Sequence, residues 1–310
     1  MWKLASVASR RRWRRPSPRC GRKSRPSATR PRSRVPEMHR PGRRNVLLGA
    51  LAWAAGIPSL ARASSPGGGI EPPILSARHA FIGNLNDTLL AVHADVAVPI
   101  ASVSKLITAL VVLGADLPLD EKIRITEDDA RLSQHTRSSL PLASVWRRDE
   151  LLEWLLVASD NRAAAALARS YPGDWPEFQR AMRMLITQMQ LFSFDFGDAS
   201  GLSSINRANA RDLGVLLVLL SQNPWFQHFA RKPTVGAKMN VNRYAHDHSV
   251  ALLAGKTGFT SEAGYCLAQA EAFGDQVFAL VVLHARDRQA RARDMDALRR
   301  YTRLTLGLGN

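Results

Sequence analysis

Short apolar runs bounded by turn residues occur near both ends of the chain, and they predict β-strands. Two of these runs, 77–85 and 89–92, flank a polar turn at 86–88 that is typical of a hairpin. After Pro233 short apolar runs bounded by turn residues occur again and predict three more strands. A Gly-Asp turn separates the last two of them. The ranges of these three strands are 250–255, 263–271 and 277–284.

Between the two strand regions, apolar residues recur at intervals of three and four, which is the spacing of one helix face. The first such pattern begins just after Pro99. Four further helices are expected in the middle of the chain, and an amphipathic helix follows the last strand. Their ranges are 149–157, 161–170, 175–188, 209–220 and 287–306.

Strands at both ends with helices between them predict an α/β fold of the α+β type. Because consecutive strands are joined by tight turns, we expect one mostly antiparallel sheet assembled from both chain ends. Helices would cover its faces, and a helical subdomain would be inserted at about 106–235. A Ser-, Gly- and Pro-rich linker at 64–74 would precede this domain, which we place at 75–310.

The net charge of +17 at first suggests a nucleic-acid-binding protein. However, residues 1–63 hold 17 of the 43 lysines and arginines and a single acid, a net charge of +16. Residues 64–310 therefore carry a net charge of only +1. Phosphate binding needs excess basic residues on the folded domain itself, so we exclude nucleic acid as a partner.

Residues 1–63 are interpreted as a basic leader. Residues 1–37 are rich in Arg, Pro and Ser and lack the apolar residues of a core. From Met38, a basic stretch ending in two arginines precedes a short apolar run and an Ala-Arg-Ala sequence, the three parts of a cleaved signal peptide. The apolar run is shorter than the roughly 20 residues of a membrane-spanning helix. We expect translation to start at Met38, and both Sec and twin-arginine export stay open.

Cysteine and histidine usage gives no sign of a disulfide, metal or cofactor. Cys20 lies in the leader, so Cys266 has no partner within the exported chain. The sequence His246-Asp247-His248 is the nearest approach to a zinc motif, and in its polar surroundings we interpret it as a loop.

Three short motifs carry the candidate chemistry. They are Ser102-Val103-Ser104-Lys105, Ser159-Asp160-Asn161 and Lys256-Thr257-Gly258. In this order they form the known signature of class A β-lactamases and penicillin-binding proteins. The first is expected to open a helix, the second to join two helices and the third to end a strand. Each motif alone has a plain alternative, because Ser102, Ser159 and Asn161 suit helix caps and Lys256 suits a solvated strand end.

The chemistry explains why these residue types occur together. A serine hydroxyl needs a nearby base, and residues three apart on a helix share one face, which places Lys105 within reach of Ser102. Lysine acts as a base only when neutral, so burial and nearby positive charge must lower its pKa. Lys256 can supply that charge or anchor a substrate carboxylate, which Thr257 would also bind. Gly258 would leave the strand edge bare for a peptide.

Beyond the motifs, residues 75–305 resemble low-molecular-mass penicillin-binding proteins, and most closely their D-alanyl-D-alanine endopeptidase branch. The resemblance extends to sequences around the three motifs and to three others, Ser200-Gly201-Leu202, Ala210-Arg211-Asp212-Leu213 and Ala263-Gly264-Tyr265-Cys266-Leu267. It implies a serine β-lactamase/penicillin-binding-protein-like fold and a periplasmic serine peptidase. Such an enzyme acts on peptidoglycan stem peptides through an acyl-enzyme, and β-lactams acylate the same serine.

The resemblance also implies a role for each motif residue. Ser102 would be the nucleophile, Lys105 its base and Ser159 a proton relay. Asn161 would donate to the amide of the substrate, and Lys256 and Thr257 would bind the substrate carboxylate. The peptide would lie against the bare strand edge at Gly258. The backbone N–H groups of Ser102 and Phe259 would form the oxyanion hole.

The sequence departs from related proteins in three places. A β-rich C-terminal domain with a membrane anchor, usual in the carboxypeptidases, does not follow the last helix, which favours the endopeptidase and at most peripheral membrane contact. A Glu-x-x-Leu-Asn segment is absent between Asn161 and Lys256, so β-lactam hydrolysis should be slow. Residues 236–249 match poorly. A carboxypeptidase and a non-catalytic penicillin-binding sensor or scaffold stay open as alternatives, and the oligomeric state is not predicted.

Overall fold

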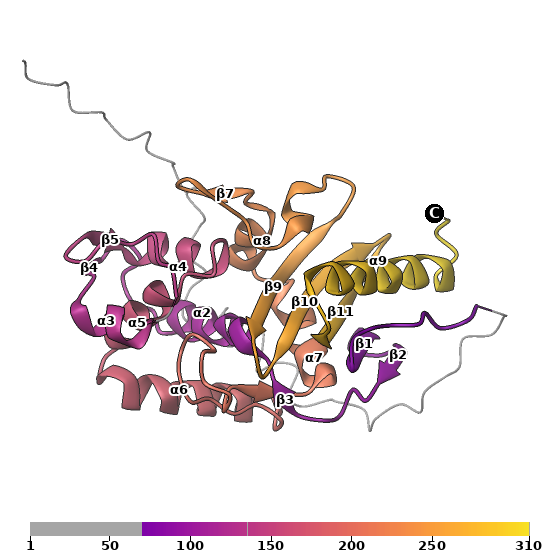
Figure 1. The fold of residues 1–310 in the computed structure, drawn as a ribbon, viewed down its shortest axis with the longest axis horizontal. Coiled ribbons are helices and arrows are strands. Elements are labelled where there is room, and N and C mark those ends of the chain that lie inside the picture. The colour runs from indigo at the N-terminus through magenta and orange to yellow at the C-terminus, as the bar shows by residue number, and fades with distance from the viewer. Residues whose placement is uncertain (1–69, 135, 310) are drawn as a thin grey trace, which may run out of the picture. The chain divides into compact units, whose positions relative to one another are not determined.

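The computed structural model describes residues 70–309 except residue 135 (Figure 1). The predicted signal peptide, the start at Met38 and most of the 64–74 linker lie outside these residues. None of the helices within the described part combines the length and the apolar composition needed to cross a bilayer.

Both ends of the domain contribute strands to one five-stranded sheet, in the order β2-β1-β11-β10-β9. Every neighbouring pair is antiparallel, and His79 of β1 lies opposite Leu283 of β11. In Figure 1 the indigo β1 and β2 lie beside the orange-to-yellow strands. The predicted mostly antiparallel sheet from both chain ends is therefore confirmed. Its strands are β1 (His79–Gly83), β2 (Thr88–Val92), β9 (Leu252–Thr260), β10 (Gly264–Phe273) and β11 (Gln276–Ala285).

Each face of the sheet is covered by a helix, because side chains alternate between the faces along a strand. Helix α9 (Arg288–Thr305) covers one face, where Ile82 shares a buried cluster with Leu298. Helix α7 (Ala210–Leu220) packs on the other face, which Phe81 enters. A Cβ atom added at Gly214 of α7 would lie 2.4 Å from the Phe81 ring, so this glycine makes room for the ring.

The helices between β2 and β9 follow the predicted pattern closely. They are α2 (Lys105–Gly114), α3 (Glu127–Leu132), α4 (Arg148–Leu156), α5 (Asn161–Arg169), α6 (Asp174–Gln188), α7 and α8 (Pro224–Arg231). Among them, α3 and α8 were not predicted. Short elements were also missed, namely β3 (Val98–Pro99), η1 (Ala101–Ser104), β4 (Lys122–Arg124), β5 (Val145–Arg147), β6 (Arg207–Ala208), β7 (Thr234–Val235), β8 (Lys238–Met239) and η2 (Arg243–His246).

Two predicted boundaries next to the motifs were wrong. The strand expected to end at Gly255 continues to Thr260, because its pairing with β10 extends to the Thr260–Gly264 pair. The third motif therefore lies inside β9. The helix expected to open at the first motif begins only at Lys105, and Ser102 lies in the preceding 3₁₀ turn, η1.

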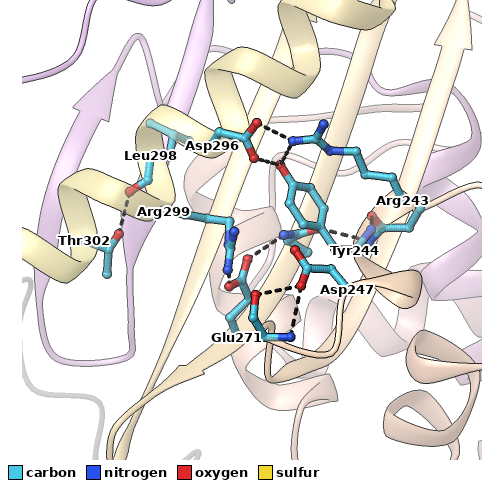
Figure 2. Close-up of polar contacts among 11 residues, drawn as sticks. Arg243, Tyr244, Asp247, Glu271, Asp296, Leu298, Arg299 and Thr302 are labelled. Carbon is cyan, nitrogen blue, oxygen red and sulfur yellow. Dashed lines mark hydrogen bonds and ion pairs between the residues drawn. The ribbon is translucent and has the colours of Figure 1, made fainter. Parts of the chain in front are cut away.

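A buried polar network on the α9 face ties β10 to the loop before β9 (Figure 2). The Glu271 carboxylate accepts hydrogen bonds from Arg299 Nε at 2.8 Å and Gln269 Nε2 at 2.6 Å. Gln269 Oε1 in turn accepts a bond of 3.0 Å from Asn242 Nδ2. Burial raises the pKa of Glu271, and its bonds to Arg299 and Gln269 act in the opposite direction. The charge of the buried Glu271 carboxylate is therefore stabilised by its hydrogen bonds to Arg299 and Gln269.

Candidate active site

Ser102 and Lys105 meet at the junction of η1 and α2. Lys105 Nζ lies 2.8 Å from Ser102 Oγ, a hydrogen-bond distance. The Lys105 side chain is fully buried, whereas Ser102 is half-buried. The 3₁₀ turn that carries Ser102 starts at Ala101, whose φ of 49° is unusual for a residue with a side chain. Such strain is typical of a functional turn.

Lys105 Nζ has two further acceptors, Asn161 Oδ1 and the Ser200 carbonyl oxygen, each at 2.5 Å. Burial lowers the pKa of Lys105 to about 7, and the carboxylates of Asp198 and Asp160 act in the opposite direction. When the amine is neutral, it has two N–H bonds and one lone pair. If Asn161 and Ser200 accept the two N–H bonds, the lone pair is left for the Ser102 proton.

The second motif joins α4 to α5, as expected. The Asp160 carboxylate caps α5 by accepting from the backbone N–H groups of Arg162 and Ala163 at 2.9 and 3.1 Å. It also accepts from Ser138 Oγ and from the backbone N–H of Ser139, which ties the loop before β5 to the motif. The cap is therefore Asp160 rather than Ser159 or Asn161.

Ser159 has a left-handed backbone with φ of 58°, and its side chain is half-buried. Among the described residues, no hydrogen bond to its hydroxyl is found. Its predicted role as a proton relay therefore stays a prediction.

The third motif places β9 against the η1 turn. A Cβ atom added at Gly258 would lie 2.6 Å from the Ile100 carbonyl oxygen and 3.2 Å from the Ser102 backbone nitrogen. Glycine is needed at this position because any side chain would push β9 away from Ser102. In the structure Gly258 makes room for η1, and its predicted role in leaving a bare edge for a peptide stays a prediction.

Lys256 is fully buried, and its Nζ donates to the Thr257 carbonyl oxygen at 2.9 Å. Burial lowers the pKa of Lys256 well below its usual value, and the positive charges of Lys105 and Arg291 lower it further. Lys256 is therefore close enough to Lys105 for their charges to interact. The Thr257 side chain is also buried, and the carboxylate clamp stays a prediction.

Phe259 follows the motif and is 55% exposed, with its ring 4.3 Å from that of Tyr265. These rings form an aromatic surface beside the third motif. The role of the Phe259 backbone N–H in an oxyanion hole stays a prediction.

Sequence reasoning missed the parts played by Asp198, Ser200 and Arg291. The Ser200 carbonyl binds Lys105 through its main chain, which leaves no mark on the residue type. The Asp198 carboxylate accepts hydrogen bonds from backbone N–H groups of residues 200–203. An acidic residue shortly before a Ser-Gly pair is typical of such a turn, and this pattern could have indicated it. Arg291 lies on α9, and its charge lowers the pKa of Lys256.

Within residues 70–309, residue 135 aside, no group of three or more His, Cys, Asp and Glu side chains forms a metal-binding cluster. His246 lies in η2 with its Nε2 3.4 Å from the Asn240 carbonyl oxygen.

Residues 69–287 match the model of peptidase family S11, described as D-alanyl-D-alanine carboxypeptidase. The chain belongs to this family. The predicted membership of the serine D-alanyl-D-alanine peptidases is thereby confirmed.

Curated relatives are similar over most of the chain. A protein of Escherichia coli (strain K12) named D-alanyl-D-alanine endopeptidase is 32% identical, over 83% of this chain and 87% of its own length. A protein of the same name from Pseudomonas aeruginosa is 34% identical, over 70% of this chain and 74% of its own.

Solved structures of related proteins share the fold. The crystal structure of the Streptomyces K15 DD-transpeptidase has a TM-score of 0.68 and 24% identity, over 75% of this chain and 98% of its own. Penicillin-Binding Protein D2 from Listeria monocytogenes, solved in the cefotaxime-bound form, has a TM-score of 0.65 and 29% identity, over 74% of this chain and 99% of its own. This chain therefore has the fold of the penicillin-binding proteins.

Proposed function

We propose that this S11 peptidase is a periplasmic serine-type DD-endopeptidase that cleaves the D-alanyl cross-links of peptidoglycan through an acyl-enzyme on Ser102. The observation that carries the proposal is the fully buried Lys105 amine, 2.8 Å from Ser102 Oγ. A buried amine with a pKa of about 7 is neutral in a large part of the molecules near neutral pH, so it can accept the serine proton.

In the proposed reaction, Lys105 takes the proton from Ser102, and the oxygen attacks the D-alanyl carbonyl carbon. The backbone N–H groups of Ser102 and Phe259 stabilise the negative charge that develops on the carbonyl oxygen. The C–N bond then breaks, and the leaving amine receives the proton that Lys105 took from Ser102, with Ser159 as the relay. Water hydrolyses the resulting ester, releases the D-alanyl carboxylate and restores Ser102.

The motif residues also suit the proposed substrate. Because Asn161 Oδ1 accepts from Lys105, its Nδ2 group is left to donate to a substrate amide. Lys256 and Thr257 would bind the carboxylate, and because burial lowers the pKa of Lys256, a bound carboxylate would stabilise its protonated form. β-Lactams would acylate the same serine, and no cofactor or metal takes part in the proposal.

The endopeptidase specificity is proposed from the names of three curated relatives, each a D-alanyl-D-alanine endopeptidase. A D-alanyl-D-alanine carboxypeptidase is the second candidate, because the family model carries that description. Purified cross-linked muropeptide dimers and monomers separate the two. Release of monomers from dimers supports the endopeptidase, and release of free D-alanine from monomers alone would contradict it.

The acyl-enzyme is tested by intact-mass measurement after incubation with a β-lactam. We expect one adduct on the wild type, none on Ser102→Ala, and one on Ser261→Ala, whose hydroxyl is exposed in the β9–β10 turn. An adduct on Ser102→Ala would mean that another serine is the nucleophile. A biological role that survives in Ser102→Ala would instead favour the non-catalytic sensor or scaffold.

The periplasmic location is proposed from the leader sequence alone. N-terminal sequencing of the protein recovered from the periplasm would test it, with cleavage after Ala63 as the expected result.

A further inference from the structure

We propose that Asp198 is a positioning residue for the Ser102–Lys105 pair, because it folds residues 200–203 into a turn that directs the Ser200 carbonyl group at Lys105 Nζ. This inference rests on the proposed function, in which Lys105 is the base. Within the described part of the chain, no hydrogen bond joins Asp198 to Ser102, so we infer that Asp198 acts through the turn and through its charge.

The Asp198 carboxylate accepts hydrogen bonds from almost every donor of the turn. Its Oδ1 accepts from the backbone N–H of Ser200 at 2.5 Å, from Ser200 Oγ at 2.8 Å and from the N–H groups of Gly201 and Leu202 at 2.6 and 3.4 Å. Its Oδ2 accepts from the backbone N–H of Ser203 at 2.5 Å. An anion that collects this many donors fixes the backbone direction of all of these residues.

Asn206, which is fully buried, fastens the Asp198 end of the turn. Its Nδ2 donates to the Asp198 carbonyl oxygen at 2.8 Å, and its Oδ1 accepts from the backbone N–H of Asp198 at 3.2 Å. Its own carbonyl oxygen accepts from the backbone N–H of Ile100 at 3.0 Å. The turn is thereby tied to the residue that precedes η1.

The turn lies directly on the strained η1 turn. Gly201 has φ of 82°, and a Cβ atom added there would lie 2.0 Å from the Ala101 carbonyl oxygen. In this position the Ser200 carbonyl oxygen accepts from Lys105 Nζ at 2.5 Å and lies 3.4 Å from Ser102 Oγ. A main-chain acceptor thus orients the proposed base together with the Asn161 side chain.

The Ser200 carbonyl matters because it occupies one of the two N–H bonds of the neutral amine. If the turn loosens, that N–H has no fixed acceptor and the lone pair of Lys105 is no longer held toward Ser102. A misplacement of about 1 Å can cost about 100-fold in rate. Asp198 also bears a negative charge that favours the protonated amine, so its removal should make Lys105 easier to deprotonate.

Asp198→Asn tests both effects, because the amide keeps the shape but has one acceptor oxygen and no charge. The rate constant for acylation of the full chain by a fluorescent penicillin is measured against pH, per active site titrated. We expect a plateau roughly 10- to 100-fold lower than in the wild type, together with a midpoint at lower pH. Asp195→Asn, an exposed acid three residues earlier, should match the wild type.

A second readout is independent of acylation. The Lys105 resonance in protein labelled at lysine Cε is titrated by NMR and assigned with Lys105→Met, and its midpoint should fall in Asp198→Asn. An unchanged plateau per titrated site in Asp198→Asn would overturn the inference, even if loss of the charge lowers the midpoint. A merely structural role, which would also overturn it, lowers the titrated fraction and leaves the rate per site unchanged. Failure of the wild type to be acylated would instead contradict the proposed function.

Discussion

Gly201 lies with its Cα against the carbonyl group of Ala101, the residue before the proposed nucleophile. A Cβ atom there would be 2.0 Å from the Ala101 oxygen and 2.9 Å from the Ser102 nitrogen. Both of these are backbone atoms, which cannot move aside as a flexible side chain can. The contact therefore links the shape of one turn to the position of Ser102, the proposed nucleophile.

Gly201→Ala should lower both stability and acylation. The left-handed φ of 82° alone costs an alanine about 1–3 kcal/mol, and the contact with Ala101 adds to this. Urea unfolding measures the first effect, and the acylation rate constant of the folded fraction measures the second. Gly114→Ala is the control, because it lies in α2 with open space around it and should be stabilised by about 0.5–1 kcal/mol. Wild-type stability in Gly201→Ala would contradict the close contact.

Lys105→Arg should reduce acylation of Ser102 by about 10²–10⁴-fold, the usual contribution of a general base. Guanidinium stays protonated in proteins and has no lone pair for the serine proton. The time course of adduct formation in intact-mass spectra measures this loss. Lys122→Arg, an exposed lysine on β4, should acylate like the wild type. Fast acylation of Lys105→Arg would show that another group removes the proton.

The acylation rate of the wild type should rise with pH around a midpoint near 7. The pKa of Lys105 is lowered to about 7 by burial, so the protonated, inactive amine predominates below that pH and the neutral amine above it. A stopped-flow or fluorescence series from about pH 5.5 to about pH 9 gives the profile. A flat profile, or a rate that falls as pH rises through the midpoint, would be inconsistent with a neutral lysine base.

Arg299→Met should destabilise the protein by about 3–5 kcal/mol at neutral pH, because it leaves the buried Glu271 carboxylate without its cation. The pKa of Glu271 is already raised by burial, so the folded state favours its protonated form. The loss should therefore shrink as pH falls toward that raised pKa. Urea unfolding at several pH values measures this dependence.

The matched control for this pair is the double variant Glu271→Gln with Arg299→Met, which has no unpaired charge and should recover much of the stability. Equal stability of the single and double variants would show that the charge of Glu271 is not the cause.

The strands and long helices could be predicted because each combines a clear apolar period with turn residues at its ends. The elements that were missed are mostly too short for any period to show, such as the three-residue strands β4 and β5. Helix α8 did carry a signal, since Asn223 caps it and Pro224 is its first residue.

The part of the site that is made of side chains from the three sequence motifs could be predicted. Ser102, Lys105 and Asn161 are indeed brought together. The third acceptor of Lys105 is a main-chain carbonyl of Ser200, and any residue type supplies one. The complete burial of Lys256 depends on how β9 packs against η1, which no local pattern encodes.

The last strand of the sheet to be synthesised, β11, is also its middle strand, with β1 on one side and β10 on the other. Before β11 is made, the β1–β2 pair is an isolated hairpin, which is only marginally stable in water. A chain that ends before residue 276 lacks β11, the strand that joins the β1–β2 hairpin to the β9–β10 hairpin. Without this sheet, β9 is not held beside Ser102. Acylation of Ser102 should therefore require a chain that extends through β11.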